Sequence, residues 1–151
     1  MTLGIREARA QDVDAMGELI GRYAAEDRML PRSRDFLLEH LRDFYVAEDE
    51  GVFLGCCAIA VLTSDLAEVR SLAVRPEAGG KGVGRALMQR AIREAAARGK
   101  EALWLAVWER NAPAIDFYRR WEFFEAGSQP FKLGDDLQND LVMVRRIARE
   151  S

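Results

Sequence analysis

Hydrophobic and polar positions in this chain follow two periodicities, which predict strands and helices in a definite order. Short apolar or alternating runs typical of strands cover residues 3–8, 44–47, 52–63, 67–74, 103–107, 123–127 and 141–144. Apolar residues recur at helical spacing over residues 11–25, 35–43, 83–98 and 112–121. The strands come first as hairpins and later alternate with helices, which predicts one mixed sheet with helices on both faces.

The connections between these elements predict one domain covering residues 1–151. Residues 48–51 are typical of a tight acidic turn within a hairpin. Residues 128–139 are mostly polar and include Pro130 and Gly134, and we expect them to form one long loop. The sequence contains no internal repeat and no low-complexity linker.

Composition narrows the function classes. The chain has 151 residues, of which 49% are hydrophobic and 31% charged, and its net charge is −3. Such a charge argues against a nucleic-acid or anionic-membrane partner, because both need clustered basic residues. The longest apolar run, residues 52–62, is too short for a membrane helix, and the N-terminus does not resemble a signal peptide. We therefore expect a cytoplasmic protein.

The cysteines do not indicate a metal site. Cys56 and Cys57 are adjacent within an apolar strand, so their side chains should point to opposite faces and pack in the core. His40 is the only histidine, and no further ligands stand at zinc-binding spacing. We predict no metal.

A glycine-rich stretch between the fourth strand and the long helix favours phosphate binding. The residues from Gly79 to Arg85 read Gly-Gly-Lys-Gly-Val-Gly-Arg. Glycines allow positive φ and close approach of a ligand, while the free N–H groups of a helix N-terminus face an anion. A flexible turn is the plain alternative. A P-loop would need Ser or Thr after its lysine, and a dinucleotide fold would usually place its glycines after an early strand.

This stretch resembles the acetyl-CoA site of the GNAT superfamily, in which Arg or Gln is followed by two residues, Gly, one residue and Gly or Ala. Gly79 departs from the pattern, because the family usually has Arg or Gln there. The resemblance implies a mixed, mostly antiparallel sheet of six to seven strands flanked by about four helices and splayed between the fourth and fifth strands. It also implies that acetyl-CoA is the cofactor.

A second motif, from Asn111 to Tyr118, lies about 30 residues further on and opens a helix. Its residues could simply form a capped and packed helix, since Asn and Pro are good helix-start residues. It also resembles the GNAT motif in which the Asn contacts the pantetheine arm and the Tyr hydroxyl approaches the CoA sulfur. The resemblance thus implies cofactor contacts at Leu72, Ala73, Val74, Gly79, Gly80, Lys81, Gly82, Val83, Gly84, Arg85, Asn111, Ala114 and Tyr118.

Acetyl transfer to an amine requires a group that removes the ammonium proton. Glu68, early on the fourth strand, stands where several GNAT enzymes carry this base, although it could be a solvent-facing carboxylate. Tyr118 would protonate the departing thiolate, or it could be a core tyrosine. The family pattern continues with a glycine where this chain has Glu122, so we expect a left-handed backbone and a local stability cost there.

The acceptor amine is predicted differently by the two halves of the chain. The first half resembles amino-acid acetyltransferases of the N-acetylglutamate synthase type, in which Arg32, Arg34 or Arg70 could clamp a substrate carboxylate. The second half resembles polyamine acetyltransferases of the PaiA type, with Asp135 among the acidic residues that could attract a cationic amine. An acetyl-CoA sensor without catalysis is an alternative, and exposed strand edges make a homodimer plausible.

Overall fold

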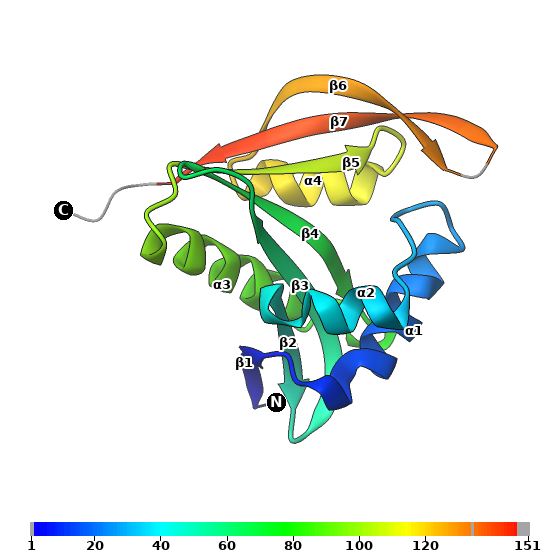
Figure 1. Cartoon of the computed structure of the whole chain (residues 1–151), viewed down its shortest axis with the longest axis vertical. Helices are drawn as coiled ribbons and strands as arrows, with labels where there is room; N and C mark the ends of the chain where they lie inside the picture. Colours follow the sequence, from blue (N-terminus) through cyan, green and yellow to red (C-terminus); the bar gives the residue numbers. More distant parts are fainter. Residues whose placement is uncertain (1, 134, 148–151) are drawn as a thin grey trace.

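The structure is a computed structural model that describes residues 2–133 and 135–147. The described residues form one seven-stranded sheet with the order β1-β2-β3-β4-β5-β7-β6 (Figure 1). The strands are β1 (Leu3–Glu7), β2 (Phe44–Asp49), β3 (Val52–Val61), β4 (Leu66–Val74), β5 (Ala102–Trp108), β6 (Phe124–Leu133) and β7 (Asp136–Arg146). Every neighbouring pair is antiparallel except β4 and β5. The predicted mixed, mostly antiparallel sheet is confirmed.

Helices cover both faces of this sheet, as the sequence predicts. The described α-helices are α1 (Val13–Ala24), α2 (Arg34–Glu39), α3 (Val83–Ala97) and α4 (Ala112–Arg120). Helices α1 and α2 build one hydrophobic core against β2 and β3, and α3 and α4 build the other against the opposite face. None of the helices in the described ranges is long and apolar enough to cross a membrane.

The two cysteines of β3 pack into different cores. Cys56 lies in the cluster beneath α1 and α2, and Cys57 lies in the cluster beneath α3 and α4. Both side chains are fully buried, and burial raises the pKa of the Cys57 thiol to about 12. The expected packing role is confirmed, since a buried thiol of this kind is neutral and unreactive.

Strands β4 and β5 separate soon after they start. Their pairing joins only Leu66–Glu68 to Ala102–Trp104, and beyond this point the strands diverge (Figure 1). A β-bulge accompanies the separation: Ser71 adopts φ +53°, and the register with β3 shifts between Arg70 and Ala73. The bulge reverses the alternation of β4, so Leu72 and Val74 pack toward α3 while Ala73 faces α1. The predicted splay is confirmed.

The prediction of a long loop over residues 128–139 is wrong. These residues belong to the antiparallel hairpin of β6 and β7, which is paired from Phe124 with Val144 to Leu133 with Asp136. The hairpin extends past the end of β5, because Trp108 pairs with Asp140 (Figure 1). Most of β6 is exposed, so the apolar alternation that marks a half-buried strand is missing. Pro130 is tolerated because β6 is an edge strand.

Candidate active site

A pocket of about 660 Å³ opens where β4 and β5 separate. Its walls come from the segment between α1 and α2, from β4 and β5, from the start of α4 and from the β6–β7 hairpin. One end reaches Gly79 and Gly84 beside the N-terminus of α3, and the other contains Glu68 and Arg70. A long ligand can therefore lie with one end at the glycine turn and the other among charged side chains.

The glycine turn has the backbone that phosphate binding requires. Gly80 and Gly82 adopt φ values of +79° and +80°, and Gly82 is the N-cap of the 15-residue helix α3. A Cβ atom at either position would have no other atom within 4 Å, so there is room for a side chain. Glycine is favoured at these positions because of the positive φ. The N–H groups of the first helical turn are consequently available to an anion.

Charge at this turn also suits an anion. Lys81 and Arg85 are exposed, and among the described residues neither forms an ion pair. Glu77, which precedes the turn, pairs with Arg22 at 3.5 Å. Glu77 is therefore paired, while Lys81 and Arg85 are available to contact phosphate.

The sequence-predicted cofactor residues divide between the pocket and its surroundings. Seven line the pocket: Leu72, Val74, Gly79, Gly84, Asn111, Ala114 and Tyr118. Ala73 and Val83 are buried in the two hydrophobic cores, and Gly80, Lys81, Gly82 and Arg85 form the turn at the end of the pocket. The two separated motifs thus meet at one site, which their spacing alone could not show.

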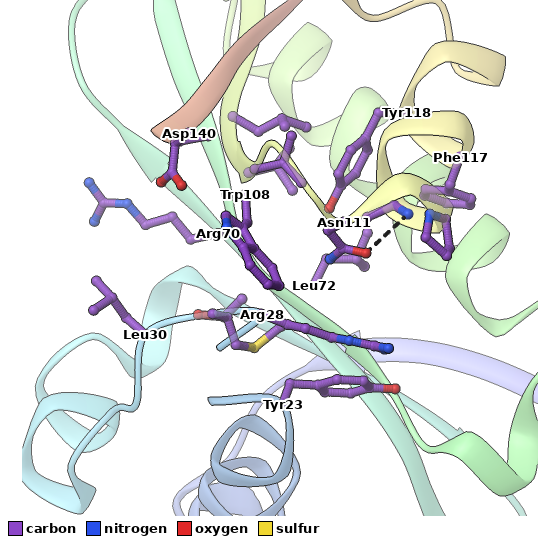
Figure 2. A pocket seen from close by; sticks show the side chains of 18 of the residues that line it. Tyr23, Arg28, Leu30, Arg70, Leu72, Trp108, Asn111, Phe117, Tyr118 and Asp140 are labelled. Carbon is purple, nitrogen blue, oxygen red and sulfur yellow. Dashed lines mark hydrogen bonds between the residues drawn. The ribbon is translucent and has the colours of Figure 1, made fainter. Parts of the chain in front are cut away.

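Asn111 and Tyr118 reach the pocket from α4. The Asn111 side chain caps this helix, because its Oδ1 accepts a hydrogen bond from Ala114 N at 3.4 Å (Figure 2). The Tyr118 ring packs against Phe117 and Phe123 with centroid distances of 5.5 and 5.8 Å. Its hydroxyl points into the pocket (Figure 2). Burial, with a smaller contribution from Cys57, raises the pKa of the Tyr118 phenol well above its usual value, so the phenol stays protonated.

Glu68 and Arg70 lie on the same face of β4 and interact directly. Arg70 Nη2 is 2.9 Å from Glu68 Oε2, and the Glu68 side chain is only 13% exposed. Arg32 approaches from the opposite wall, with its guanidinium 4.4 Å from the centroid of the Phe36 ring. Burial, followed by repulsion from Arg70, lowers the pKa of Arg32. The pocket therefore brings together three of the charged residues that the sequence analysis proposes.

Two further acceptor candidates lie away from this pocket. Arg34 is exposed at the start of α2 and pairs with Asp14. Asp135 is exposed in the turn between β6 and β7. Neither is among the residues that line the pocket.

Sequence reasoning missed several residues of the pocket. Tyr23 lines it and donates a hydrogen bond from its hydroxyl to the Val74 carbonyl, which ties α1 to the end of β4. Trp104 and Trp108 line it from β5, and Asp140 lines it from β7. A signal for the tryptophans was present, because they alternate with the buried residues Leu103, Leu105 and Val107. Asp140 differs from the other residues, because it belongs to the acidic stretch that resembles polyamine acetyltransferases; the structure places it on β7.

The sequence is similar to that of a known protein family. The family model described as the acetyltransferase (GNAT) family matches residues 11–123, which is most of the chain. The chain belongs to this family. The match includes both motifs and extends from the start of α1 to the end of α4.

Curated relatives of this GNAT chain have acetyltransferase names. It is 48% identical over 87 residues to the N-acetyltransferase CT2212 of Chlorobaculum tepidum, a match covering 58% of this chain and 56% of that protein. It is 32% identical over 129 residues to the amino-acid acetyltransferase of Mycobacterium tuberculosis, covering 83% of this chain and 71% of that protein. The chain thus spans little more than half of the first relative, and 24% of the amino-acid acetyltransferase of Pseudomonas fluorescens.

Solved structures give the same family and fold. Rv2747 of Mycobacterium tuberculosis, crystallised with CoA, is 26% identical with a TM-score of 0.81, covering 96% of this chain and 99% of that one. N-acetylglutamate synthase of Neisseria gonorrhoeae, complexed with CoA and N-acetyl-glutamate, is 25% identical with a TM-score of 0.80, covering 99% of this chain and 36% of that one. Ard1 of Thermoplasma volcanium, at 20% identity and a TM-score of 0.88, shows the fold alone.

Proposed function

We propose that this GNAT chain transfers an acetyl group from acetyl-CoA to the amino group of a small amino acid-like acceptor. One observation carries the proposal: the separation of β4 and β5 opens a continuous pocket from the glycine turn to Glu68. One ligand in this pocket can therefore contact both the phosphate site at the glycine turn and the acid–base pair of Glu68 and Tyr118. Relatives named as amino-acid acetyltransferases support the class of acceptor.

The residues of the pocket fit CoA. The backbone N–H groups at Gly80 and Gly82, with Lys81 and Arg85 beside them, would hold its phosphates. Leu72 and Val74 lie on the stretch of β4 that is not paired with β5, so their backbone groups can hold the pantetheine arm. The gonococcal and mycobacterial structures with CoA support this cofactor.

Acetyl-CoA supplies the acetyl group as an activated thioester. During transfer an N–C bond forms, the C–S bond breaks, the amine loses a proton and the thiolate gains one. Glu68 would accept the amine proton, since its carboxylate lies in the pocket. Tyr118 would donate its proton to the departing sulfur, since its hydroxyl points into the pocket and the phenol is in its protonated form. Solvent would then take the proton from Glu68 and return one to Tyr118.

The charges of the pocket favour an acceptor that carries a carboxylate. Arg32 and Arg70 both reach the pocket, while Glu68 compensates only Arg70. Arg32 therefore has no ion-pair partner among the described residues, and an acceptor carboxylate would supply one. Asp135, one of the acidic residues expected to attract a polyamine, does not line the pocket. An amino acid carries the carboxylate that Arg32 lacks, whereas a polyamine does not.

The test is acceptor-dependent release of CoA thiol from acetyl-CoA, measured for wild type, Glu68→Gln and Tyr118→Phe. Glutamate, glutamine, lysine and spermidine serve as acceptors. We expect kcat to fall by about 10²- to 10⁴-fold in each variant, because each removes a proton-transfer group. CoA affinity should stay within about threefold in calorimetry, since neither substitution touches the phosphate site. Glu18→Gln, on the exposed side of α1, is the matched control and should behave as wild type.

Two results would overturn the proposal. Thiol release that is unchanged in both variants would remove Glu68 and Tyr118 from the mechanism. CoA binding without release in the presence of any acceptor would instead indicate an acetyl-CoA sensor.

A further inference from the structure

Two charged groups of the pocket lack a counter-ion among the described residues. Arg32 has no ion pair, and Asp140 has neither an ion pair nor a hydrogen bond from another side chain. The other charges are accounted for, because Arg70 pairs with Glu68 at 2.9 Å and Arg28 pairs with Glu26 at 3.3 Å. Asp27 also borders the pocket, but it is exposed to water.

Asp140 faces the pocket from β7. Cross-strand pairing with Trp108 of β5 places the two side chains on one face of the sheet. The Asp140 carboxylate lies on the same side of the pocket as the Arg70 guanidinium (Figure 2). Burial raises the pKa of Asp140 above its usual value, with no charged neighbour acting against it. A partly buried carboxylate without a partner is unfavourable, and a cation beside it would remove that cost.

The surroundings of Asp140 also suit a cation. On β5, Trp104 and Trp108 lie on either side of Ala106, and all three line the pocket. Both indole groups therefore lie on the pocket side of β5, and an aromatic ring can attract a cation at its face. A carboxylate and two tryptophans are therefore grouped on the β5 and β7 side of the pocket.

Arg32 lies on the opposite wall, in the segment between α1 and α2. Its Nε is buried without a hydrogen-bond partner, and its guanidinium is stacked on Phe36. Arg32 lines the pocket, and burial and repulsion from Arg70 both lower its pKa. An anion bound there would satisfy the buried donor and offset the repulsion.

We infer that Asp140 is a substrate-binding residue that holds the ammonium group of a zwitterionic acceptor, while Arg32 holds its carboxylate. The inference rests on the proposed function and specifies the acceptor: it carries both charges, one for each wall. It also reconciles the two resemblances in the sequence, because a basic residue of the first half and an acidic residue of the second half line one pocket. Asp140 then determines specificity for the free amine over its acetylated product.

Calorimetry with the CoA-bound protein tests this assignment without requiring turnover. The probes are L-glutamate, L-glutamine and L-lysine, each compared with its N-α-acetyl derivative. We expect Asp140→Asn to weaken binding of the best free amino acid by at least about tenfold, as for loss of a charge-assisted hydrogen bond. Binding of its acetyl derivative should change less than about twofold, because its nitrogen is neutral. Retained binding of the derivative also shows that the variant is folded.

Other variants complete the experiment. Arg32→Gln should weaken the free amino acid and its acetyl derivative alike, since both carry the carboxylate. Asp116→Asn is the matched control, because Asp116 is exposed on α4 and does not line the pocket. It should leave every affinity unchanged.

Several outcomes would overturn the inference. One is that Asp140→Asn changes the affinity for the free amino acid and for its acetyl derivative equally, or changes neither. Another is that the wild-type protein binds no zwitterion. A third is that Asp135→Asn, and not Asp140→Asn, selectively weakens binding of the free amino acid. Failure of the proposed function is distinguishable. If binding is selective and depends on Asp140 but no thiol is released, the subsite is supported and the proposed acetyl transfer is refuted. If the protein acetylates amines that lack a carboxylate, and Asp140→Asn does not change this activity, acetyl transfer is supported and the subsite is refuted.

Discussion

Single residues with unusual backbone conformation lie close to the candidate site. Among the described residues, Asp27, Glu50, Ser71 and Glu122 are the non-glycine positions with positive φ. Asp27 and Ser71 line the pocket, and Glu122 follows α4 directly. The left-handed backbone that the sequence predicts at Glu122 is confirmed by its φ of +67°.

Replacing Glu122 with glycine should stabilise the protein. We expect Glu122→Gly to raise the free energy of unfolding by about 0.5–1 kcal/mol, since a left-handed non-glycine residue costs about 1–2 kcal/mol and the gain is reduced by greater freedom in the unfolded chain. The lost ion pair with Arg145 has little weight, because the Glu122 side chain is 82% exposed. Urea unfolding measures the change. Glu122→Ala removes the same ion pair but keeps the Cβ, so equal stability of the two variants would contradict the strain at this position.

At the same scale, the sequence identified side chains but not their interactions. Glu68 and Tyr118 both line the pocket, as their motifs suggest. The spacing of Glu68 and Arg70 on one strand already favoured a common face, yet their 2.9 Å contact depends on rotamers that the sequence does not specify. The burial of Tyr118 likewise depends on Phe117 and Phe123 packing around it.

At the scale of elements, the bulge in β4 directs which residues face the cofactor end of the pocket. Ser71 and Leu72 together oppose Cys57 of β3, and the alternation of β4 reverses at this point. Without the bulge, Leu72 would share the face of Glu68 and Arg70. The conformation of one residue thus separates the acceptor part of β4 from its cofactor part.

Ser71 provides a test of this arrangement. A β-branched residue is strongly disfavoured at a φ of +53°, so Ser71→Val should lower the free energy of unfolding by about 1–2 kcal/mol. It should also weaken CoA binding, because the backbone at Leu72 would shift. Ser71→Gly accepts the conformation and should bind CoA as wild type does. Thermal unfolding and calorimetry measure both effects, and unchanged CoA affinity in Ser71→Val would show that the bulge does not position the cofactor.

The hairpin of β6 and β7 shows where reading elements from sequence fails. Its residues are polar because much of the hairpin extends beyond the rest of the sheet and is exposed. Apolar and polar residues alternate along a strand only where one face of that strand is buried. In this hairpin the strands are recognised by the pairing of their backbones. Asp140 belongs to the acidic stretch noted in the sequence, but its place beside Trp108 at the pocket follows only from the strand pairing.

At the scale of the whole molecule, the sheet consists of two parts with a narrow connection. Strands β1 to β4 and strands β5 to β7 are joined by the pairing of Leu66–Glu68 with Ala102–Trp104 (Figure 1). A ligand in the pocket contacts both parts, because β4, β5 and α4 all contribute to the lining. Cofactor binding should therefore stabilise the fold as a unit.

Thermal unfolding checks this expectation. CoA at about 100 times its dissociation constant should stabilise the protein by about 2.7 kcal/mol, which corresponds to a rise in Tm of roughly 5–10 °C for a chain of this size. Hydrogen exchange should slow in β4 beyond Glu68 and in β5 beyond Trp104. Gly82→Ala strains the left-handed N-cap of α3 and should show a much smaller ligand-induced rise. An equal rise in both proteins would exclude this turn as the phosphate site.

Features that depend on neighbouring residues could be predicted from the amino-acid sequence alone. Apolar periodicity predicts helices and buried strands, and glycine spacing predicts the left-handed turn at Gly80 and Gly82, because these follow from local backbone geometry. The folded structure alone shows how distant segments are arranged. It separated β4 from β5 to create the pocket, and it placed Arg32, Asp140 and the two tryptophans of β5 around it. Those positions depend on sheet register and long-range packing, which no local pattern encodes.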